Sequence, residues 1–206
     1  MPTRTESTLF VTERTGDRLW AFTVLAETSV RLGRTAEAEE SFRHALAAGG
    51  HEAYLLGVFA DFLLDQDRGK EVITLLKDET RVDALLLRLA LAEAAQAPPP
   101  SALTLHVATL QARFEASHLR GDSVHQREES RFVLHLLHRP QEALHLAKSN
   151  WQVQREPADC RVLLEAALAA HDAPAASPVL EFMRTNKLED VHLDKLAVHF
   201  NTLTSR

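Results

Sequence analysis

The stretch Arg31–Gly50, RLGRTAEAEESFRHALAAGG, ends one apolar-periodic segment at a glycine and begins another at once. Within it Ala38, Phe42 and Ala45 follow one another at spacings of four and three, which place them on one face of an α-helix. Small residues on such a face let two helices approach closely, while a ring fills the space beside the contact. The stretch therefore predicts closely packed neighbouring helices joined by a short turn.

The same periodicity continues in both directions along the chain. Between breaks in the pattern, apolar residues recur at three and four, and no alternating run indicates a strand. Most glycines stand at these breaks: Gly16, Gly33, Gly49, Gly50 and Gly121. We expect helices near 17–32, 35–48, 52–65, 68–78, 81–96, 101–119, 122–138, 140–155, 158–171, 173–185 and 189–203. The fold class expected is all-α.

Helix-start residues support these boundaries. Thr35, Ser101 and Asp122 each stand where a side-chain oxygen could cap the first turn. Pro140 and Pro157 suit the first helical position, where no backbone donor is lost.

The helices come in pairs that repeat. A shift of 34 residues places Ala26 on Ala60, Ala38 on Val72 and Phe42 on Leu76, and a weaker shift of 33 relates Leu134 to Ala167 and Ala143 to Ala176. A single hairpin cannot bury its apolar face, so such units stack on one another and the last one needs a cover. Val191, Leu196 and Phe200 suit a covering helix at 189–203.

In this pattern the chain resembles the tetratricopeptide repeat family, and its Ala, Leu and Arg-rich texture is similar to the bacterial members. The first unit matches at Phe22, Leu25, Ala26, Ala38, Phe42 and Ala45, with Phe42 and Leu25 expected to fill the space beside the small residues. The second keeps Leu56, Phe59, Ala60, Leu63, Val72 and Leu76, and the last keeps Leu163, Ala167, Ala176, Leu180 and Met183. The resemblance implies one solenoid domain over 17–203, after an irregular segment 1–16. Its form would be a right-handed superhelical array of about five hairpins (17–48, 52–78, 81–119, 122–155 and 158–185) with a cap at 189–203.

Composition excludes several classes of protein. The 206 residues carry 23 Lys and Arg against 29 Asp and Glu, a net charge of −6, which argues against nucleic acid as a partner. A single cysteine, Cys160, allows neither an intrachain disulfide nor a multi-cysteine zinc site. The start has no signal-peptide pattern, and no apolar run suits a membrane span. We expect a cytoplasmic protein, or an exported one if the chain is a fragment of a longer protein.

Eleven histidines raise the question of a metal site. His135 and His138 lie three apart, and His125 precedes Glu128 and Glu129 on one helical face, but a second matching motif is missing. We interpret these residues as a solvated, ion-paired helix face. The RGD tripeptide at 120–122 is interpreted as a turn, and no nucleophile elbow or phosphate-binding loop is present. We therefore expect no enzyme activity, no cofactor and no metal.

The segment 113–131 is dense in charge of both signs. Its charged residues are Arg113, Glu115, Arg120, Asp122, Arg127, Glu128, Glu129 and Arg131. Spacings of three and four favour ion pairs within and between the two helices. We expect a structural ion-pair network here, with a polar docking surface as the alternative.

The resemblance implies a non-catalytic scaffold that holds a peptide or helix of another protein in a concave groove lined by the first helix of each pair. Two other classes stay open: a metal-binding or enzymatic helical protein using the histidine-rich middle region, and a sensor or oligomerisation part of a larger protein. The oligomeric state is also open.

The repeat register predicts which residues face a partner. On the helix 52–65 the stripe beside the buried one holds Tyr54, Gly57, Asp61 and Asp65, and the equivalent stripe of the first unit holds Trp20, Thr23, Glu27 and Arg31. From these we choose Trp20, Glu27, Arg31, Tyr54, Asp61 and Asp65 as binding residues. Aromatics beside carboxylates suit a basic segment. Family members that hold acidic C-termini use asparagines where Thr23 and Glu27 stand here. The alternative is that Trp20 belongs to the core and the acids are solvated.

Overall fold

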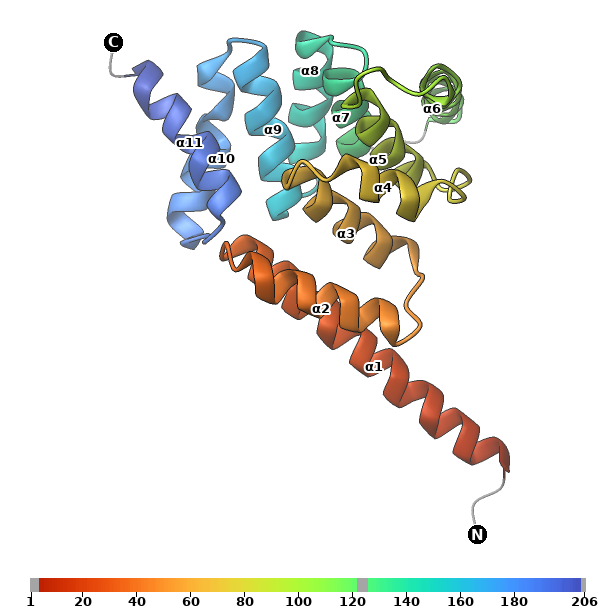
Figure 1. The fold of residues 1–206 in the computed structure, drawn as a ribbon. Helices are drawn as coiled ribbons and strands as arrows, with labels where there is room; N and C mark the ends of the chain where they lie inside the picture. The colour runs from red at the N-terminus through yellow and green to blue at the C-terminus, as the bar shows by residue number, and fades with distance from the viewer. Residues whose placement is uncertain (1–3, 122–125, 205–206) are drawn as a thin grey trace. The chain divides into compact units, whose positions relative to one another are not determined.

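The computed structural model describes the backbone of residues 4–121 and 126–204 and the side chains of residues 16–121 and 126–200. Within this part the chain is all-α, as expected, and it contains no strand (Figure 1). The helices are α1 (Arg4–Arg31), α2 (Thr35–Ala47), α3 (Ala53–Asp65), α4 (Gly69–Leu76), α5 (Asp83–Ala94), α6 (Ala102–Leu119), α7 (Gln126–His135), α8 (Pro140–Trp151), α9 (Pro157–Ala169), α10 (Ala173–Asn186) and α11 (Val191–Thr204).

The boundaries of α2 to α11 lie within a few residues of those expected from periodicity. Pro140 and Pro157 open α8 and α9 as predicted. Gly33 and Gly121 adopt φ values of 71° and 76° in the turns after α1 and α6, a conformation that glycine takes without steric cost.

The side-chain caps predicted at Thr35 and Ser101 are wrong. Neither Thr35 nor Ser101 caps its helix with a side-chain hydrogen bond, and Asp122 lies outside the described residues. Asp172 does cap α10, accepting a hydrogen bond from the Ala175 amide at 3.2 Å. A cap depends on the rotamer as well as on the residue type, so capping residues in a sequence mark helix starts better than they predict the bonds.

The N-terminal segment is also corrected. Residues 4–16, expected to be irregular, belong to α1, which runs through Gly16 without a break. A glycine inside a helix costs only about 1 kcal/mol relative to alanine, so it does not end a helix by itself. The sequence predicts a boundary at Gly16 because apolar periodicity weakens there.

The chain divides into two compact units, unit 1 (Met1–Asp67) and unit 2 (Arg68–Arg206), where a single domain over 17–203 was expected. The division falls within the expected hairpin 52–78. Only three residues separate the end of α3 at Asp65 from the start of α4 at Gly69. Residues 66–68 contain no Pro, Gly or Ser run of the kind that marks a linker, so the sequence gives no sign of a division here.

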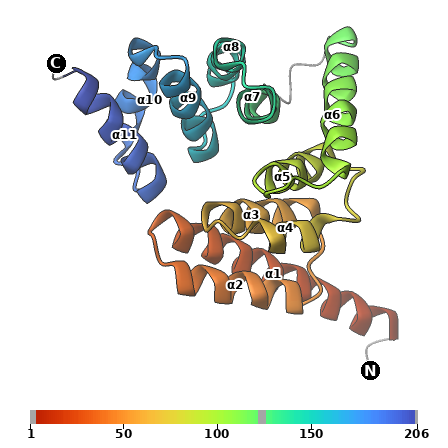
Figure 2. The ribbon, with the colours of Figure 1, turned by 45° about the horizontal axis from the view of Figure 1, so that its top comes forward.

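In unit 1, α1 and α2 pack side by side as a hairpin, and α3 lies against both (Figures 1 and 2). The small residues of the opening pattern are fully buried: Ala26, Ala38 and Ala45. Phe42 is also fully buried, and its ring centroid lies 5.0 Å from that of Phe59 and 5.5 Å from that of Phe62. The expected code of small and large residues is therefore confirmed at these positions.

Leu25 is an exception, because its side chain is 53% exposed where a space-filling role was expected. On α1 the buried residues include Thr23, Ala26 and Ser29, and Leu25 lies beyond the edge of that side. The half-buried Phe22 instead stacks on His44 of α2, with ring centroids 5.2 Å apart. Phe22, and not Leu25, is thus the large side chain of α1 that packs on α2 here.

Unit 2 is built from helices that pack mainly on helices near them in the sequence (Figure 2). α5 lies between α4 and α6, α8 lies between α7 and α9, and both α10 and α11 contact α9. The expected covering helix α11 buries Leu193 and Phe200, while Val191 and Leu196 are half-buried. None of the helices described has a stretch apolar and long enough for a membrane span.

Candidate functional site

The residues predicted to bind a partner all lie in unit 1, on α1 and α3. Trp20 and Tyr54 are among the most exposed large side chains of the described chain, at 69% and 64%. Glu27, Arg31, Asp61 and Asp65 are half-buried. The alternative that Trp20 is a core residue is therefore wrong.

A hydrogen bond joins the two stripes. The Tyr54 hydroxyl of α3 donates to Glu27 Oε1 of α1 at 2.7 Å, although the residues lie 27 positions apart. The carboxylate thereby holds an exposed aromatic ring in one orientation, and a ring already ordered loses less conformational entropy when a partner binds. We call Trp20, Glu27 and Tyr54 the aromatic face.

The other two positions of the stripes are buried. Thr23 is 5% exposed and its hydroxyl donates to the Leu19 carbonyl at 2.8 Å, within α1. Gly57 is buried on α3. Neither residue is available to a partner, so the side chains that a partner could contact are the aromatic and charged ones.

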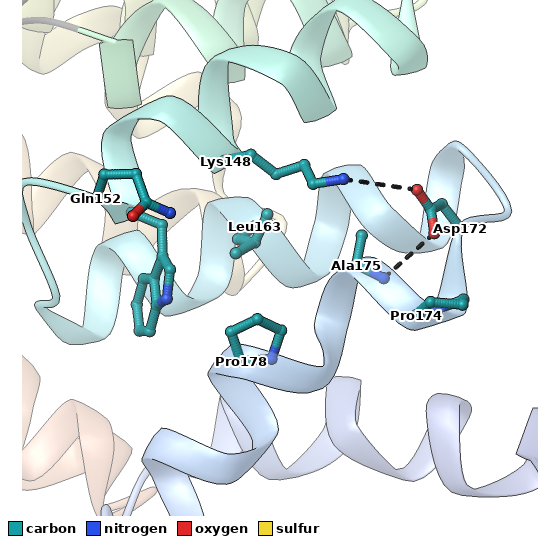
Figure 3. Close-up of a pocket in the computed structure, with 8 residues that line it drawn as sticks. Lys148, Gln152, Leu163, Asp172, Pro174, Ala175 and Pro178 are labelled. Atoms are coloured by element: carbon teal, nitrogen blue, oxygen red, sulfur yellow. Dashed lines mark hydrogen bonds and ion pairs between the residues drawn. The ribbon is translucent and has the colours of Figure 1, made fainter.

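A separate cavity of about 250 Å³ lies in unit 2 between α8, α9 and α10 (Figure 3). It is lined by Lys148, Trp151, Gln152, Leu163, Asp172, Pro174, Ala175 and Pro178. Lys148 and Trp151 lie three residues apart on α8, and Gln152 is the residue that follows the helix. This spacing is the signal in the sequence for their grouping on one side of α8. Hereafter it is called the α8–α10 cavity.

Polar groups line one part of this cavity. Lys148 Nζ lies 3.9 Å from Asp172 Oδ2, and Figure 3 shows the two side chains reaching toward each other. Trp151 is 4% exposed. Its ring contacts Phe182 edge-on and the Arg155 guanidinium, which lies 5.6 Å from the ring centroid.

The charged segment 113–131 forms ion pairs, chiefly with residues outside it. Arg113 Nη1 lies 2.6 Å from Asp83 Oδ1, and Arg88 Nη1 lies 3.0 Å from Glu128 Oε2. Arg127 contacts Glu156, Asp159 and Glu128. Burial lowers the pKa of Arg127, but the hydrogen bond to Glu156 and the nearby carboxylate charges outweigh it, so the pKa is raised. The network links α5, α7 and α9 over sequence separations of 29 to 40 residues, so spacing could not identify the partners.

Three histidines of unit 2 pair with glutamates of other helices. His106 Nδ1 lies 2.8 Å from Glu93, His118 Nε2 lies 2.8 Å from Glu129, and His135 Nε2 lies 3.1 Å from Glu165. Among the described residues no group of three or more His, Cys, Asp or Glu side chains is placed to hold a metal ion. His125 lies outside the described residues.

Cys160 is buried on α9, and burial, with the nearby Asp159 carboxylate, raises its pKa to about 12. Such a thiol stays protonated at neutral pH and is a poor nucleophile. Cys160 is therefore a packed residue of α9.

No protein-family model, curated protein or solved structure matches this chain. Its functional interpretation therefore depends on its own side chains, and among the described residues the aromatic face and the α8–α10 cavity are two arrangements open to a binding partner or ligand.

Proposed function

We propose that this chain is a non-catalytic scaffold that binds a peptide or helix of a partner protein, and that the aromatic face of unit 1 is part of its binding surface. The proposal includes a tetratricopeptide-like stacking of the helical hairpins into a right-handed superhelix. The hydrogen bond between Tyr54 and Glu27 carries it, since it orders an exposed aromatic ring beside a carboxylate.

The exposed aromatics supply the apolar part of the surface. Trp and Tyr are enriched where few residues provide most of the binding energy, because each buries a large area with few rotatable bonds. Val24, 39% exposed, lies one helical turn after Trp20 on α1 and extends the apolar area toward Glu27.

The charges favour a basic partner. Glu27 and Asp61 occupy equivalent positions in the first and second repeats. Lys or Arg side chains of a partner would meet carboxylates there, and a cation over a Trp or Tyr ring gains about 0.5–2 kcal/mol more. Rim charges of this kind act mainly on specificity and association rate.

The test is binding of immobilised peptides, with one set rich in Lys and a matched set rich in Glu. We expect the Lys-rich set to be retained by the wild-type chain, and Trp20→Ala/Tyr54→Ala to lose at least about tenfold in affinity. The charge variants Glu27→Lys/Asp61→Lys should weaken the same interaction about tenfold or more with little change in melting temperature.

The matched control is Leu105→Ala/Val153→Ala, which removes two side chains of unit 2 that are 67% and 74% exposed. This variant should bind as the wild type does. Equal retention of both peptide sets, or equal loss in the control and the aromatic variant, would exclude the aromatic face as a site for basic partners.

A further inference from the structure

We propose that the α8–α10 cavity binds a free α-amino acid with an apolar side chain, with Lys148 contacting its carboxylate and Asp172 its ammonium group. This inference is independent of the proposed protein-binding function, because the cavity lies wholly within unit 2 and the aromatic face within unit 1. Nothing in it requires covalent chemistry.

The cavity is polar on one side and apolar on the other. The Lys148 and Asp172 side chains are 54% and 38% exposed, whereas Leu163 is 1% exposed and Trp151 is 4% exposed. Ala175 and Pro178 add further apolar surface from α10. A ligand that fits this distribution has a charged head near solvent and an apolar tail directed inward.

The two charges suit a head group that carries both signs. Lys148 Nζ and Asp172 Oδ2 lie 3.9 Å apart, longer than the 2.7–2.9 Å typical of a charge-assisted hydrogen bond, so their own contact is loose. In an α-amino acid the carboxylate and the ammonium group are joined through one carbon atom. Placed against this pair, each ligand charge would meet the opposite protein charge. A ligand with one charge would leave Lys148 or Asp172 facing a like charge or none.

Trp151 adds a hydrogen-bond donor to the apolar part of the cavity. Its side chain is 4% exposed and lines the cavity. The indole N–H can donate a hydrogen bond but cannot accept one. Lys148 lies three residues earlier on the same side of α8, so a carboxylate held by Lys148 would offer the indole N–H an acceptor.

Pro178 contributes in a different way. It lies inside α10 and has no N–H, so the carbonyl of Pro174, four residues earlier, lacks its usual helical donor. Pro174 also lines the cavity. This backbone acceptor, together with Asp172, matches an ammonium group, which has three donors.

The volume limits the size of the ligand. Sites for drug-sized ligands generally measure about 300–1,000 Å³, and this cavity of about 250 Å³ is smaller. It suits a molecule of amino-acid size better than a nucleotide or a folded peptide.

The experiment is calorimetric titration of the full chain with L-leucine, and separately with L-phenylalanine, N-acetyl-L-leucine and L-leucinamide. We expect saturable binding of at least one of the two amino acids below about 10 mM. N-acetyl-L-leucine lacks the ammonium charge and L-leucinamide lacks the carboxylate, so both should bind at least about tenfold more weakly than L-leucine. Equal binding of either derivative would overturn the proposal, because it would show an apolar pocket only.

Variants locate the site. Asp172→Asn keeps an oxygen that can cap α10 but removes the charge, and Lys148→Gln removes the opposite charge; each should weaken binding about tenfold or more. Trp151→Phe keeps most of the ring and removes the N–H, and should weaken binding severalfold. The control Glu181→Gln alters an exposed ion pair with Arg184 on the same helix and should bind as the wild type does.

Two results would overturn the assignment. One is the absence of saturable binding of either amino acid to the wild-type chain, when its cooperative melting shows that it is folded. The other is unchanged binding in Asp172→Asn and Lys148→Gln, which would move any amino-acid site elsewhere on the chain.

Discussion

Arg88 of α5 donates from Nη1 to Glu128 Oε2 of α7 at 3.0 Å, with 9% and 15% of their side chains exposed. Arg88 also donates to the Ala84 carbonyl at 2.8 Å, so two acceptors hold the guanidinium. Breaking a shielded ion pair is costly because the remaining charge has left water without gaining a counter-charge.

The first prediction follows from this pair. Glu128→Gln should lower the free energy of unfolding by about 3 kcal/mol, near the lower limit for a broken buried pair, because the amide oxygen can still accept a hydrogen bond from Arg88. Replacement of both partners in Arg88→Met/Glu128→Leu should recover most of the loss. Chemical denaturation measures the free energy of unfolding of the wild type, of Glu128→Gln and of the double variant. The control is Arg43→Gln, which breaks the exposed pair with Glu39 and should cost less than about 1 kcal/mol. Equal losses at the two sites would contradict the prediction.

A second prediction concerns the contact between α1 and α2. Ala38→Leu should cost about 1–3 kcal/mol by forcing apart a fully buried helix contact, and Phe42→Ala about 3–5 kcal/mol by leaving a cavity beside Phe59 and Phe62. Thermal unfolding followed by circular dichroism measures both. Ala36→Leu, at an exposed position of the same helix, serves as the control and should melt like the wild type. Wild-type melting of all three variants would show that the assigned packing register is wrong.

Two glycines of unit 1 should respond to alanine in opposite directions. A Cβ at Gly50 would lie 3.0 Å from the Ala45 carbonyl oxygen and would also overlap the side chains of Leu19 and Leu55, so Gly50→Ala should destabilise by about 1–3 kcal/mol. A Cβ at Gly16 meets nothing within 4 Å. Since Gly16 lies inside α1, Gly16→Ala should stabilise by about 0.5–1 kcal/mol. Destabilisation by Gly16→Ala would argue against a helix that continues through residue 16.

The fourth prediction is a pH dependence at Glu165. Burial raises the pKa of this carboxyl, but the hydrogen bond from His135 and the charge of Arg161 outweigh it and hold the pKa at about 2, below its ordinary value of 4.5. Because the folded-state pKa is depressed, the stabilisation is complete above about pH 5 and is lost as the pH falls toward 2. The two pKa values correspond to about 3 kcal/mol.

The measurement compares the wild type with Glu165→Gln in urea denaturation from pH 6 down to pH 2. We expect the wild type to be the more stable protein at pH 6 and its advantage to shrink by up to about 3 kcal/mol at the acid end. A difference between the two proteins that stays constant over this range would rule out the depressed pKa as a source of stability.

The sequence by itself determined the helical class, the positions of α2 to α11 and the small and large residues that meet between helices, because these depend on local periodicity. Ala38, Phe42 and Ala45 share one helical face in any fold that keeps the helix. It also placed Trp20 and Tyr54 outside the buried stripes of their helices, and both side chains are exposed.

Only the tertiary structure decided which distant side chains meet. The bond from Tyr54 to Glu27 and the pairing of Arg88 with Glu128 depend on how helices cross, and many other carboxylates in the chain have the same chemistry as those two. The α8–α10 cavity arises from three helices together, and no one of them contains it. Likewise Gly16, which resembles a break in the sequence, lies within α1, because a glycine's small energetic cost is overridden when the surrounding residues remain helical.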